Sequence, residues 1–290
     1  MAKIIDGKKI AEDIQNELKQ RVEELRKRGI IPRLATVLIG ENSSAISYLR
    51  RIKNSFGEVD IPTEDFKFPE EITEEELEKK ICEINQNSKL YGILLLVPLP
   101  KHININRISE IINPKKDVDC VNPLNLGLFL LGNPRFVPCT ALAVYEILSR
   151  SGYDPRDKNV VVAGAGRMGT SIALFLLQKW AVVTACHARS RDLAKYTKTA
   201  DIVVSAAGKP HLITADMIKE GAVVIDVGVS AVEDPERPGK FKLIGDVDFD
   251  AVKEKAEAIT PVVGGVGPVT TAMLISNLVK ATEMMELLRS

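Results

Sequence analysis

The stretch that most restricts the fold of this chain runs from Asn159 to His187. It contains a β-branched segment, a glycine turn, an amphipathic segment and a second β-branched segment, in the order of a βαβ unit. Gly164, Gly166 and Gly169 have G-x-G-x-x-G spacing where the first strand leads into the helix. Glycine lets the backbone turn tightly and approach phosphates, and a helix N-terminus offers free N–H groups. The stretch predicts a dinucleotide-binding turn; the alternative is a tight turn with a structural role only.

The loop after the second β-branched segment bears on the choice of cofactor. Enzymes that select NAD commonly have an acidic residue there, which binds the ribose hydroxyls. This chain has no acid at that place, and Arg189, Ser190 and Arg191 offer two cations and a hydroxyl to a 2′-phosphate. We therefore expect NADP; the alternative is that the two arginines are ordinary solvated charges.

Length and charge indicate a two-domain protein that binds small molecules. The chain has 290 residues, enough for about two domains. Its 39 Lys and Arg residues balance 39 Asp and Glu residues, so no basic field indicates nucleic acid or an anionic membrane as a partner.

The four cysteines have no C-x-x-C spacing, which favours reduced thiols over a disulfide framework or a metal site. The N-terminal residues mix charges with apolar residues, unlike a signal peptide. No apolar run approaches the roughly 20 residues of a membrane span. We expect a cytoplasmic protein without a membrane segment or a bound metal.

Strands and helices alternate through the first half of the chain. Periodicity predicts helices over 8–28, 43–56 and 73–87, and strands over 33–39, 65–68 and 92–97. Thr73 and Glu76 have the spacing of a capping box. A polar, turn-rich segment over 113–125 precedes a helix over 141–150, which we expect to link two domains.

The second half continues this alternation after the βαβ unit. We expect strands over 201–206 and 222–227 with a helix after Thr214 between them, a solvated hairpin tip over 234–239, and a glycine-rich turn over 260–268 before a helix over 270–288. Apolar strands that alternate with helices are typical of parallel sheets covered on both faces. The fold class is therefore α/β.

Three features outside the βαβ unit are candidates for chemistry: Tyr48 on a predicted helix, the acid pair Asp117 and Asp119, and the turn GGVGP at 264–268. Each has an ordinary alternative. A tyrosine on an amphipathic helix is usually part of the core, closely spaced aspartates usually cap loops, and glycine turns are often only turns.

Together these stretches resemble the methylenetetrahydrofolate dehydrogenase/methenyltetrahydrofolate cyclohydrolase family. The matching segments are GILLLVPLP (92–100), KDVDCVNPLNLG (116–127), FVPCTA (136–141), AAGKPHLI (206–213), VVIDVGV (223–229), GDVDF (245–249) and TPVVGGVGPVTTAMLISN (260–277). They occur in the family's order over nearly the whole chain.

The resemblance implies a two-domain α/β protein. An N-terminal α/β folate-binding domain would span 1–137 and be completed by the C-terminal helix 270–290. A Rossmann-type NADP-binding domain would span 138–269, with the active-site cleft between the two domains. The family also implies a homodimer.

The resemblance further assigns roles to single residues. Tyr48 would stack on the aminobenzoyl ring of the folate, and Asp119 would accept hydrogen bonds from the pterin. The other residues implied to bind folate are Leu96, Pro98, Gly264, Gly265 and Pro268. The residues implied to bind NADP are Gly164, Ala165, Gly166, Arg167, Gly169, Arg189, Ser190 and Val229.

Several positions depart from the family's pattern. Ile52 stands where the family has a lysine four residues after the tyrosine, and Leu96 stands where it has a glutamine. The family's arginine in the nucleotide loop is missing at Ala165, with Arg167 as a candidate substitute. Cys120 replaces a glycine and Val263 a proline.

The resemblance implies an NADP-dependent 5,10-methylenetetrahydrofolate dehydrogenase with a second activity, hydrolysis of the methenyl product to 10-formyltetrahydrofolate. Because Ile52 and Leu96 replace the family's lysine and glutamine, we expect this hydrolysis to run near its uncatalysed rate. Lys53 is the candidate substitute for the missing lysine, but one residue along a helix turns a side chain by about 100°, away from the face of Tyr48. Bifunctional activity through Lys53, a different reduced pterin as substrate, and a catalytically silent binding protein are the alternatives.

Overall fold

A computed structural model of the chain describes residues 1–234, 237, 239 and 241–288. The chain divides into two compact units, each formed by two segments: Met1–Ala11 with Thr140–Thr270, and Glu12–Cys139 with Thr271–Ser290. Over the described residues the first unit contains a six-stranded sheet and the second a three-stranded sheet. We call them the six-stranded unit and the three-stranded unit.

The sheet of the three-stranded unit consists of β2 (Leu34–Ile39), β3 (Thr63–Phe68) and β4 (Gly92–Leu95), in the order β3-β2-β4. Both pairings are parallel, with Leu34 opposite Thr63 on one side and Gly92 on the other. Every residue of the central strand β2 is buried. Helices cover both faces, which is the arrangement that parallel sheets require.

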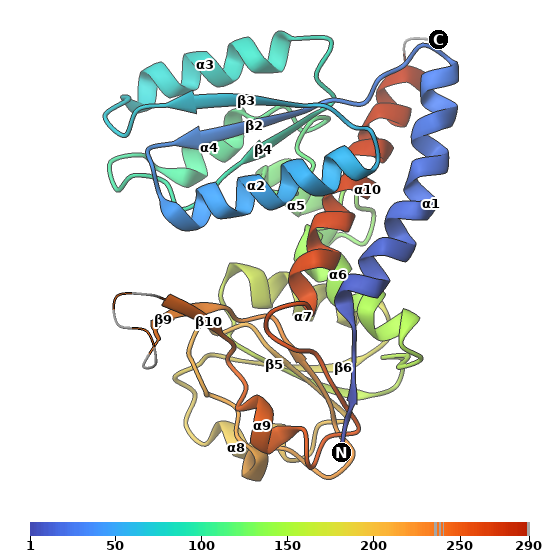
Figure 1. Cartoon of the computed structure of the whole chain (residues 1–290), viewed down its shortest axis with the longest axis vertical. Helices are drawn as coiled ribbons and strands as arrows, with labels where there is room; N and C mark the ends of the chain where they lie inside the picture. The colour runs from blue at the N-terminus through green and yellow to red at the C-terminus, as the bar shows by residue number, and fades with distance from the viewer. Residues whose placement is uncertain (235–236, 238, 240, 289–290) are drawn as a thin grey trace. The chain divides into compact units, whose positions relative to one another are not determined.

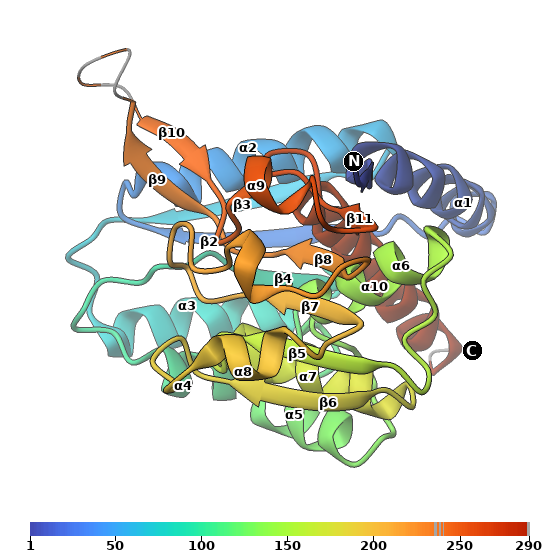
Figure 2. The ribbon, with the colours of Figure 1, turned by 90° about the horizontal axis from the view of Figure 1, so that it is seen from below.

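Helix α2 (Ser43–Glu58) lies on one face of this sheet, and α3 (Glu74–Gln86) and α4 (Ile105–Ile111) lie on the other (Figures 1 and 2). Apolar side chains of α3 and α4 form one cluster with alternate residues of β2 and β4. The buried residues of α2 follow its helical period: Ala45, Leu49, Ile52 and Phe56. The short helix α4 was not predicted from the sequence.

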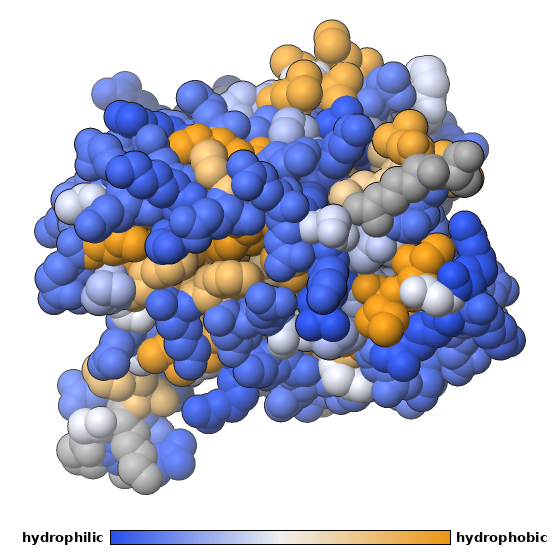
Figure 3. Space-filling model, turned by 90° about the horizontal axis from the view of Figure 1, so that it is seen from above, coloured by the Kyte–Doolittle hydropathy of each residue, from blue (hydrophilic) through white to orange (hydrophobic). Residues whose placement is uncertain are grey.

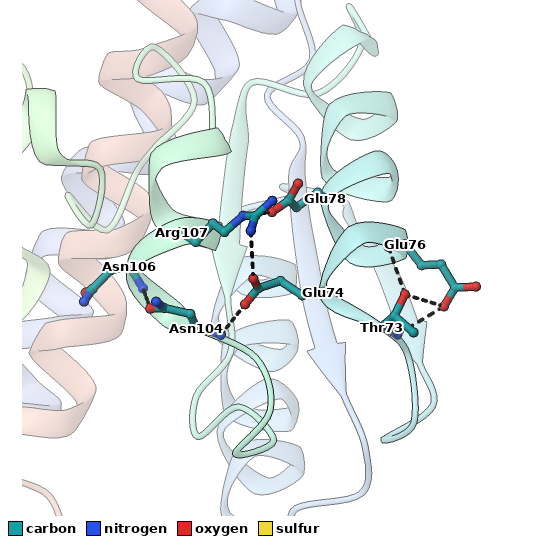
Figure 4. Close-up of polar contacts among 7 residues, drawn as sticks. All are labelled: Thr73, Glu74, Glu76, Glu78, Asn104, Asn106 and Arg107. Carbon is teal, nitrogen blue, oxygen red and sulfur yellow. Dashed lines mark hydrogen bonds and ion pairs between the residues drawn. The ribbon is translucent and has the colours of Figure 1, made fainter.

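The capping box at the start of α3 is confirmed (Figure 4). The Thr73 hydroxyl accepts a hydrogen bond from the backbone N–H of Glu76 at 3.2 Å, and the Glu76 carboxylate accepts one from the N–H of Thr73 at 3.1 Å. Arg107 on α4 forms ion pairs with Glu74 and Glu78 on α3. The capping box satisfies the start of α3, and Arg107 adds exposed ion pairs beside the apolar cluster that α3 and α4 share.

Two long helices contribute residues to both units: α1 (Gly7–Lys27) and α10 (Val266–Leu287). Within the three-stranded unit, Arg21 on α1 binds Glu283 on α10 at 2.6 Å. Helix α10 begins at Val266 rather than at the predicted residue 270, because Pro268 is compatible with the first helical turn, where no partner is needed for its missing N–H.

The sheet of the six-stranded unit is entirely parallel, in the order β1-β11-β8-β7-β5-β6. Figure 2 shows the strands from β11 to β6 side by side in this order. The strands are β1 (Lys3–Ile4), β5 (Asn159–Ala163), β6 (Val182–Cys186), β7 (Ile202–Ser205), β8 (Val223–Asp226) and β11 (Ala258–Ile259). The first eleven residues, which the predicted folate domain 1–137 includes, cluster with this unit, and β1 pairs with β11 at the edge of its sheet.

The connections in this unit differ from prediction in two places. After Thr214 there is only the 3₁₀ turn η1 (Ala215–Met217) in place of the predicted helix. The predicted tip 234–239 follows β9 (Ser230–Glu233), which pairs antiparallel with β10 (Phe241–Ile244). Residues 235, 236 and 238 of that tip lie outside the described residues.

The remaining helices are α5 (Pro123–Leu130), α6 (Cys139–Arg150), α7 (Arg167–Gln178), α8 (Leu193–Thr197) and α9 (Phe249–Val252).

None of the helices in the described part of the chain has the length and apolar character needed to cross a membrane. On the face drawn in Figure 3, hydrophilic residues predominate and apolar residues occur in several separate patches.

Candidate functional site

The predicted glycine turn connects β5 to α7 in the six-stranded unit. Gly164 has φ +107°, a backbone conformation that favours glycine. A Cβ atom at Gly164 would also lie 2.5 Å from the carbonyl of Ala206. A Cβ atom at Gly169 would lie 1.9 Å from the carbonyl oxygen of Gly164, so the third glycine lets α7 pack against the turn. The glycine spacing thus has a steric cause at both of these positions.

The N-terminus of α7 is open. Its N-cap residue is Gly166, and no side chain caps the first turn by a hydrogen bond. The N–H groups of that turn have no partner within the helix, and together with the helix dipole they favour an anion. This is the arrangement that binds a pyrophosphate in dinucleotide folds.

A pocket of about 500 Å³ lies at this turn. Its lining residues are Gly164, Ala165, Gly166, His187, Ala188, Arg189, Ser190, Ala206 and Ala207. Five of the predicted nucleotide residues are in this set. The pocket lining does not include the other three, which are Arg167, Gly169 and Val229. Gly169 packs against the backbone of the glycine turn, and Val229 is exposed before β9.

The sequence prediction assigned no role to Ala206 and Ala207, which come directly after β7. Since β7 is the neighbour of β5 in the parallel sheet, its carboxyl end lies beside the glycine turn. The order of the strands, which a single sequence does not reveal, was the missing signal.

The cationic loop follows β6, the other neighbour of β5. The backbone N–H of Ser190 donates to the carbonyl of His187 at 2.9 Å, which closes a turn. Arg189 is exposed and lines the pocket with Ser190, whereas Arg191 does not line it. The pocket therefore offers a cation and a hydroxyl on the side opposite Ala206, as binding of a 2′-phosphate requires.

In the three-stranded unit, Tyr48 on α2 is half-buried. Burial raises the pKa of Tyr48 above its usual range, and the nearby Asp119 carboxylate raises it further. The phenol therefore stays protonated at neutral pH. The guanidinium of Arg51 lies 5.6 Å from the centroid of the Tyr48 ring, close enough for a cation–π contact.

The two predicted aspartates have different environments. Asp117 is fully buried and accepts hydrogen bonds from the N–H groups of Val121 and Asn122, both at 2.9 Å, and from the Asn125 amide at 2.8 Å. It is a loop cap. Asp119 is half-buried and its charge raises the pKa of Tyr48, so it is the more accessible acid of the pair.

A buried polar group holds the loop that carries Asp119. The side-chain amide of Asn277 on α10 donates to the carbonyls of Val118 at 2.8 Å and Val137 at 3.0 Å, and it lies 3.5 Å from the Cys139 sulfur. Burial raises the pKa of the Cys139 thiol well above its usual range. The charge of Asp119 and the hydrogen bond between Asp119 and the thiol raise this pKa further. The loop next to Tyr48 is thus fixed from several sides.

Cys120, which stands where the resembling family has glycine, has φ +56°, in the left-handed region. Glycine adopts this conformation more readily than cysteine does. Cys120 therefore adopts the backbone conformation that a glycine would take more easily at this turn.

The two apolar replacements are buried in this unit. Ile52 lies one helical turn after Tyr48 and is 0% exposed, and Leu96 is 2% exposed. Lys53 points elsewhere, since its ammonium group lies 2.7 Å from the Asp65 carboxylate on β3. No titratable side chain stands at either replaced position.

The second glycine turn belongs to the six-stranded unit. Gly264 has φ +104°, and a Cβ atom at Gly265 would lie 2.5 Å from the carbonyl oxygen of Pro261. A Cβ atom at Gly7 would lie 1.8 Å from the carbonyl oxygen of Gly265, so the start of α1 contacts this turn directly. Pro268 lies in the first turn of α10, and Pro98 is exposed after β4 in the other unit.

No group of His, Cys, Asp and Glu side chains that could hold a metal ion occurs in the part of the chain that the structure describes. All four cysteines are free thiols.

Comparison with known proteins decides the family. Residues 5–119 match the family model described as the catalytic domain of tetrahydrofolate dehydrogenase/cyclohydrolase, and residues 138–286 match that of its NAD(P)-binding domain. The chain belongs to the tetrahydrofolate dehydrogenase/cyclohydrolase family. A relative named bifunctional protein FolD, from Nautilia profundicola, is 45% identical over 97% of both chains.

Solved structures of the family agree with the fold over nearly the full length. The dehydrogenase-cyclohydrolase of Trypanosoma brucei, solved with NADP and an inhibitor, has a TM-score of 0.94 and 38% identity and covers 98% of both chains. The bifunctional enzyme of Campylobacter jejuni has a TM-score of 0.93 and 38% identity and covers 98% of this chain and 100% of its own. The predicted α/β fold with a Rossmann-type nucleotide-binding domain is confirmed.

Proposed function

We propose that this family member is an NADP-dependent 5,10-methylenetetrahydrofolate dehydrogenase that does not hydrolyse the methenyl product above the uncatalysed rate. One observation carries the proposal: Tyr48 and Asp119 are retained together, while the position one turn after Tyr48 is the fully buried Ile52. The residues for holding a folate are present, and those for moving a proton are replaced.

Dehydrogenation makes modest demands on the protein. Bound NADP would supply the acceptor for the hydride that leaves the methylene carbon of the folate. The cation left on the folate is stabilised by its own nitrogen atoms, so the residues of the chain have to hold and orient the folate rather than supply a strong acid or base. The protonated Tyr48 ring is suited to stacking on the aminobenzoyl group, and the two oxygens of Asp119 are suited to the donors of a pterin.

The pocket at the glycine turn supports the choice of NADP. Gly166 and the open N-terminus of α7 suit a pyrophosphate, and Arg189 with Ser190 suits a 2′-phosphate. Arg167, the candidate substitute for the family's loop arginine, does not line the pocket. The preference for the phosphate therefore depends chiefly on Arg189.

Hydrolysis of the methenyl group makes a stricter demand. Water has to attack the methenyl carbon, and protons then move between oxygen and nitrogen. A titratable group in reach typically contributes about 10²- to 10⁴-fold to such a step. Ile52 and Leu96 neither donate nor accept protons, and the Lys53 ammonium group is paired with Asp65. The proposed hydrolysis rate is therefore close to background.

The same replacements motivate two other candidates. Ile52 and Leu96 place buried apolar side chains where the family has polar ones, which suits a different reduced pterin as the one-carbon carrier. The loss of polar groups at both positions also suits a silent folate- or nucleotide-binding protein.

The folate-binding role of the three-stranded unit, a homodimer and a cytoplasmic location also belong to the proposal. They rest on family membership, on the balanced charge of the chain and on the free thiols. Light scattering during size-exclusion chromatography tests the dimer directly.

An absorbance assay with purified protein tests the function. Methylenetetrahydrofolate is supplied with NADP or with NAD, and NADPH or NADH formation is followed. We expect many turnovers per enzyme molecule with NADP and weaker turnover with NAD. NADPH formed only up to the enzyme concentration would support a silent binding protein, and faster turnover with another reduced pterin would support the other carrier.

A further inference from the structure

Two buried aspartates in the six-stranded unit take no part in the function proposed above. Asp226 ends β8 and is 3% exposed, and Asp246 follows β10 and is 0% exposed. Both lie in segments that resemble the family, yet neither lines the nucleotide pocket. Burial of an aspartate is costly unless its oxygens are fully hydrogen-bonded, so their partners indicate what they are for.

Asp246 binds the loop that follows β7. Its Oδ2 atom accepts hydrogen bonds from the backbone N–H groups of Ala207 at 2.6 Å and Gly208 at 3.1 Å, and from the hydroxyl of Ser205 at 3.0 Å. Its Oδ1 atom accepts one from the N–H of Lys209 at 2.7 Å. One carboxylate thus holds three consecutive N–H groups of an otherwise exposed loop.

That loop is a wall of the nucleotide pocket. Ala206 and Ala207 line the pocket, and Gly164 packs so closely on them that a Cβ atom there would lie 2.5 Å from the Ala206 carbonyl and 2.6 Å from the Ala207 nitrogen. The hydrogen bond from Ala207 to Asp246 is therefore made by the peptide group on which the glycine turn rests. A movement of this peptide changes the pocket directly.

Asp226 fixes Asp246 in turn. Its Oδ1 atom accepts hydrogen bonds from the N–H groups of Asp246 and Gly228, both at 3.1 Å, and its Oδ2 atom accepts one from Val247 at 2.9 Å. Each carboxylate also occupies the space that a side chain would need at a glycine close in sequence to the other aspartate. A Cβ atom at Gly228 would lie 2.1 Å from the Asp246 carboxylate carbon, and one at Gly245 would lie 2.0 Å from an Asp226 oxygen.

We propose that Asp246 is a positioning residue for nucleotide binding, which holds the loop 206–209 in the place that the glycine turn and the cofactor require, and that Asp226 holds Asp246. This inference rests on the proposed function, because it assumes that the pocket binds NADP. A carboxylate is needed here since it only accepts hydrogen bonds, whereas asparagine has to turn its NH₂ group toward one set of the loop's N–H donors.

The main test is Asp246→Asn in the full-length protein, with NADP affinity measured by isothermal titration calorimetry and both KM values and kcat measured by the absorbance assay. We expect the Kd and KM for NADP to rise by roughly tenfold to a hundredfold, as for a buried donor left without its acceptor. The kcat at saturating NADP and the KM for the folate should stay unchanged. A structural defect alone would lower the amount of active protein without this split.

Asp248→Asn is the matched control. Asp248 lies two residues away and caps α9 through the N–H of Ala251 at 3.4 Å, and none of its hydrogen bonds reaches the loop 206–209. Because asparagine caps a helix about as well as aspartate, Asp248→Asn should leave both the thermal unfolding midpoint and the NADP affinity nearly unchanged. Equal NADP affinity for Asp246→Asn and the unmodified protein, or equal losses in both variants, would overturn the inference.

Amide hydrogen exchange in the unmodified protein provides a test that does not depend on the folding of a variant. Gly208 and Lys209 are exposed, so their amides should exchange rapidly unless the Asp246 bonds persist. We expect slow exchange at Ala207, Gly208 and Lys209 without nucleotide, and rapid exchange at all three would refute the role of Asp246. If the unmodified protein itself fails to bind NADP, the proposed function fails instead.

Discussion

The Nζ atom of Lys53 lies 2.7 Å from Oδ2 of Asp65, and the Thr36 hydroxyl donates to Oδ1 of the same carboxylate at 2.9 Å. Burial tends to raise the pKa of Asp65, but the hydrogen bonds from Lys53 and Thr36 and the charge of Lys53 lower it overall. The lysine adjacent to Ile52 is therefore engaged with a strand of the sheet. Its ammonium group pairs with β3 and does not stand at position 52, where the side chain is the buried Ile52.

Lys53→Met should leave the hydrolysis of methenyltetrahydrofolate at its background rate and leave dehydrogenation unchanged. Neither reaction should change, because Lys53 binds Asp65. The variant should also fold, because a partly exposed ion pair of this kind contributes at most about 1 kcal/mol to stability. The loss of methenyl absorbance over time measures the hydrolysis. Fast hydrolysis by the unmodified protein that disappears in Lys53→Met would restore the bifunctional assignment through Lys53.

Ile52→Lys combined with Leu96→Gln should produce measurable hydrolysis. The pair returns a titratable group and a polar partner to two buried positions, and a group of this kind contributes about 10²- to 10⁴-fold to proton transfer. The gain should be partial, because the surrounding residues pack against apolar side chains. Ile52→Met with Leu96→Gln is the control, with a long uncharged side chain in place of the lysine, and equal rates in the two double variants would contradict the prediction.

Arg189→Ala should weaken NADP binding selectively. A charge-assisted hydrogen bond contributes about 1.5 to 3 kcal/mol, so kcat/KM for NADP should fall by about tenfold or more while that for NAD stays constant. Arg191→Ala serves as the comparison, since Arg191 belongs to the same loop but does not line the pocket. Steady-state kinetics with both cofactors measures this. Equal losses of kcat/KM for NADP in the two variants would contradict the prediction, as would equal kcat/KM values for NAD and NADP in the unmodified protein.

The pH dependence of stability should contain a contribution from Asp226. Burial raises the pKa of Asp226 to about 7, from an ordinary value of 3.8, and the charge of Asp246 acts in the same direction. Between these values the folded state binds a proton that the unfolded state has lost. The contribution of Asp226 to stability is therefore fully present below pH 3.8 and is lost as the pH rises through about 7.

Asp226→Asn has no such proton. The difference in unfolding free energy between the unmodified protein and Asp226→Asn should therefore fall as pH rises from about 5 to about 7, by up to about 1.4 kcal/mol per pH unit. Denaturant titrations at several pH values measure it. Parallel pH curves for the two proteins would show that Asp226 is ionised throughout.

Much of the fold follows from local patterns in the sequence. The strand β2, the helix α2 and the capping box at Thr73 are predictable because apolar periodicity and cap residues act within a few positions. The short helix α4 is not, since it has only seven residues and its buried Ile108 packs in a cluster with α3 and the sheet, which a short sequence period does not report. Edge strand β1 has only two residues and depends on its pairing with β11, far along the chain.

The candidate site was predictable to a similar extent. Gly164, Arg189 and Ser190 stand next to strand ends and could be assigned from spacing alone. Ala206 and Ala207 could not, because only the order of the strands brings them beside the glycine turn. Nor does the sequence reveal that Asp117 caps its own loop while the charge of Asp119 acts on Tyr48, since both depend on how the loop folds.

The most direct test of the central claim follows both products in one reaction. Purified protein is mixed with methylenetetrahydrofolate and NADP, and the absorbances of NADPH and of methenyltetrahydrofolate are recorded together, with spontaneous hydrolysis measured in a blank. A dehydrogenase whose position 52 is the buried Ile52 should form NADPH and methenyltetrahydrofolate in equal amounts after this correction. NADPH formation with the methenyl compound consumed much faster than in the blank would contradict the claim.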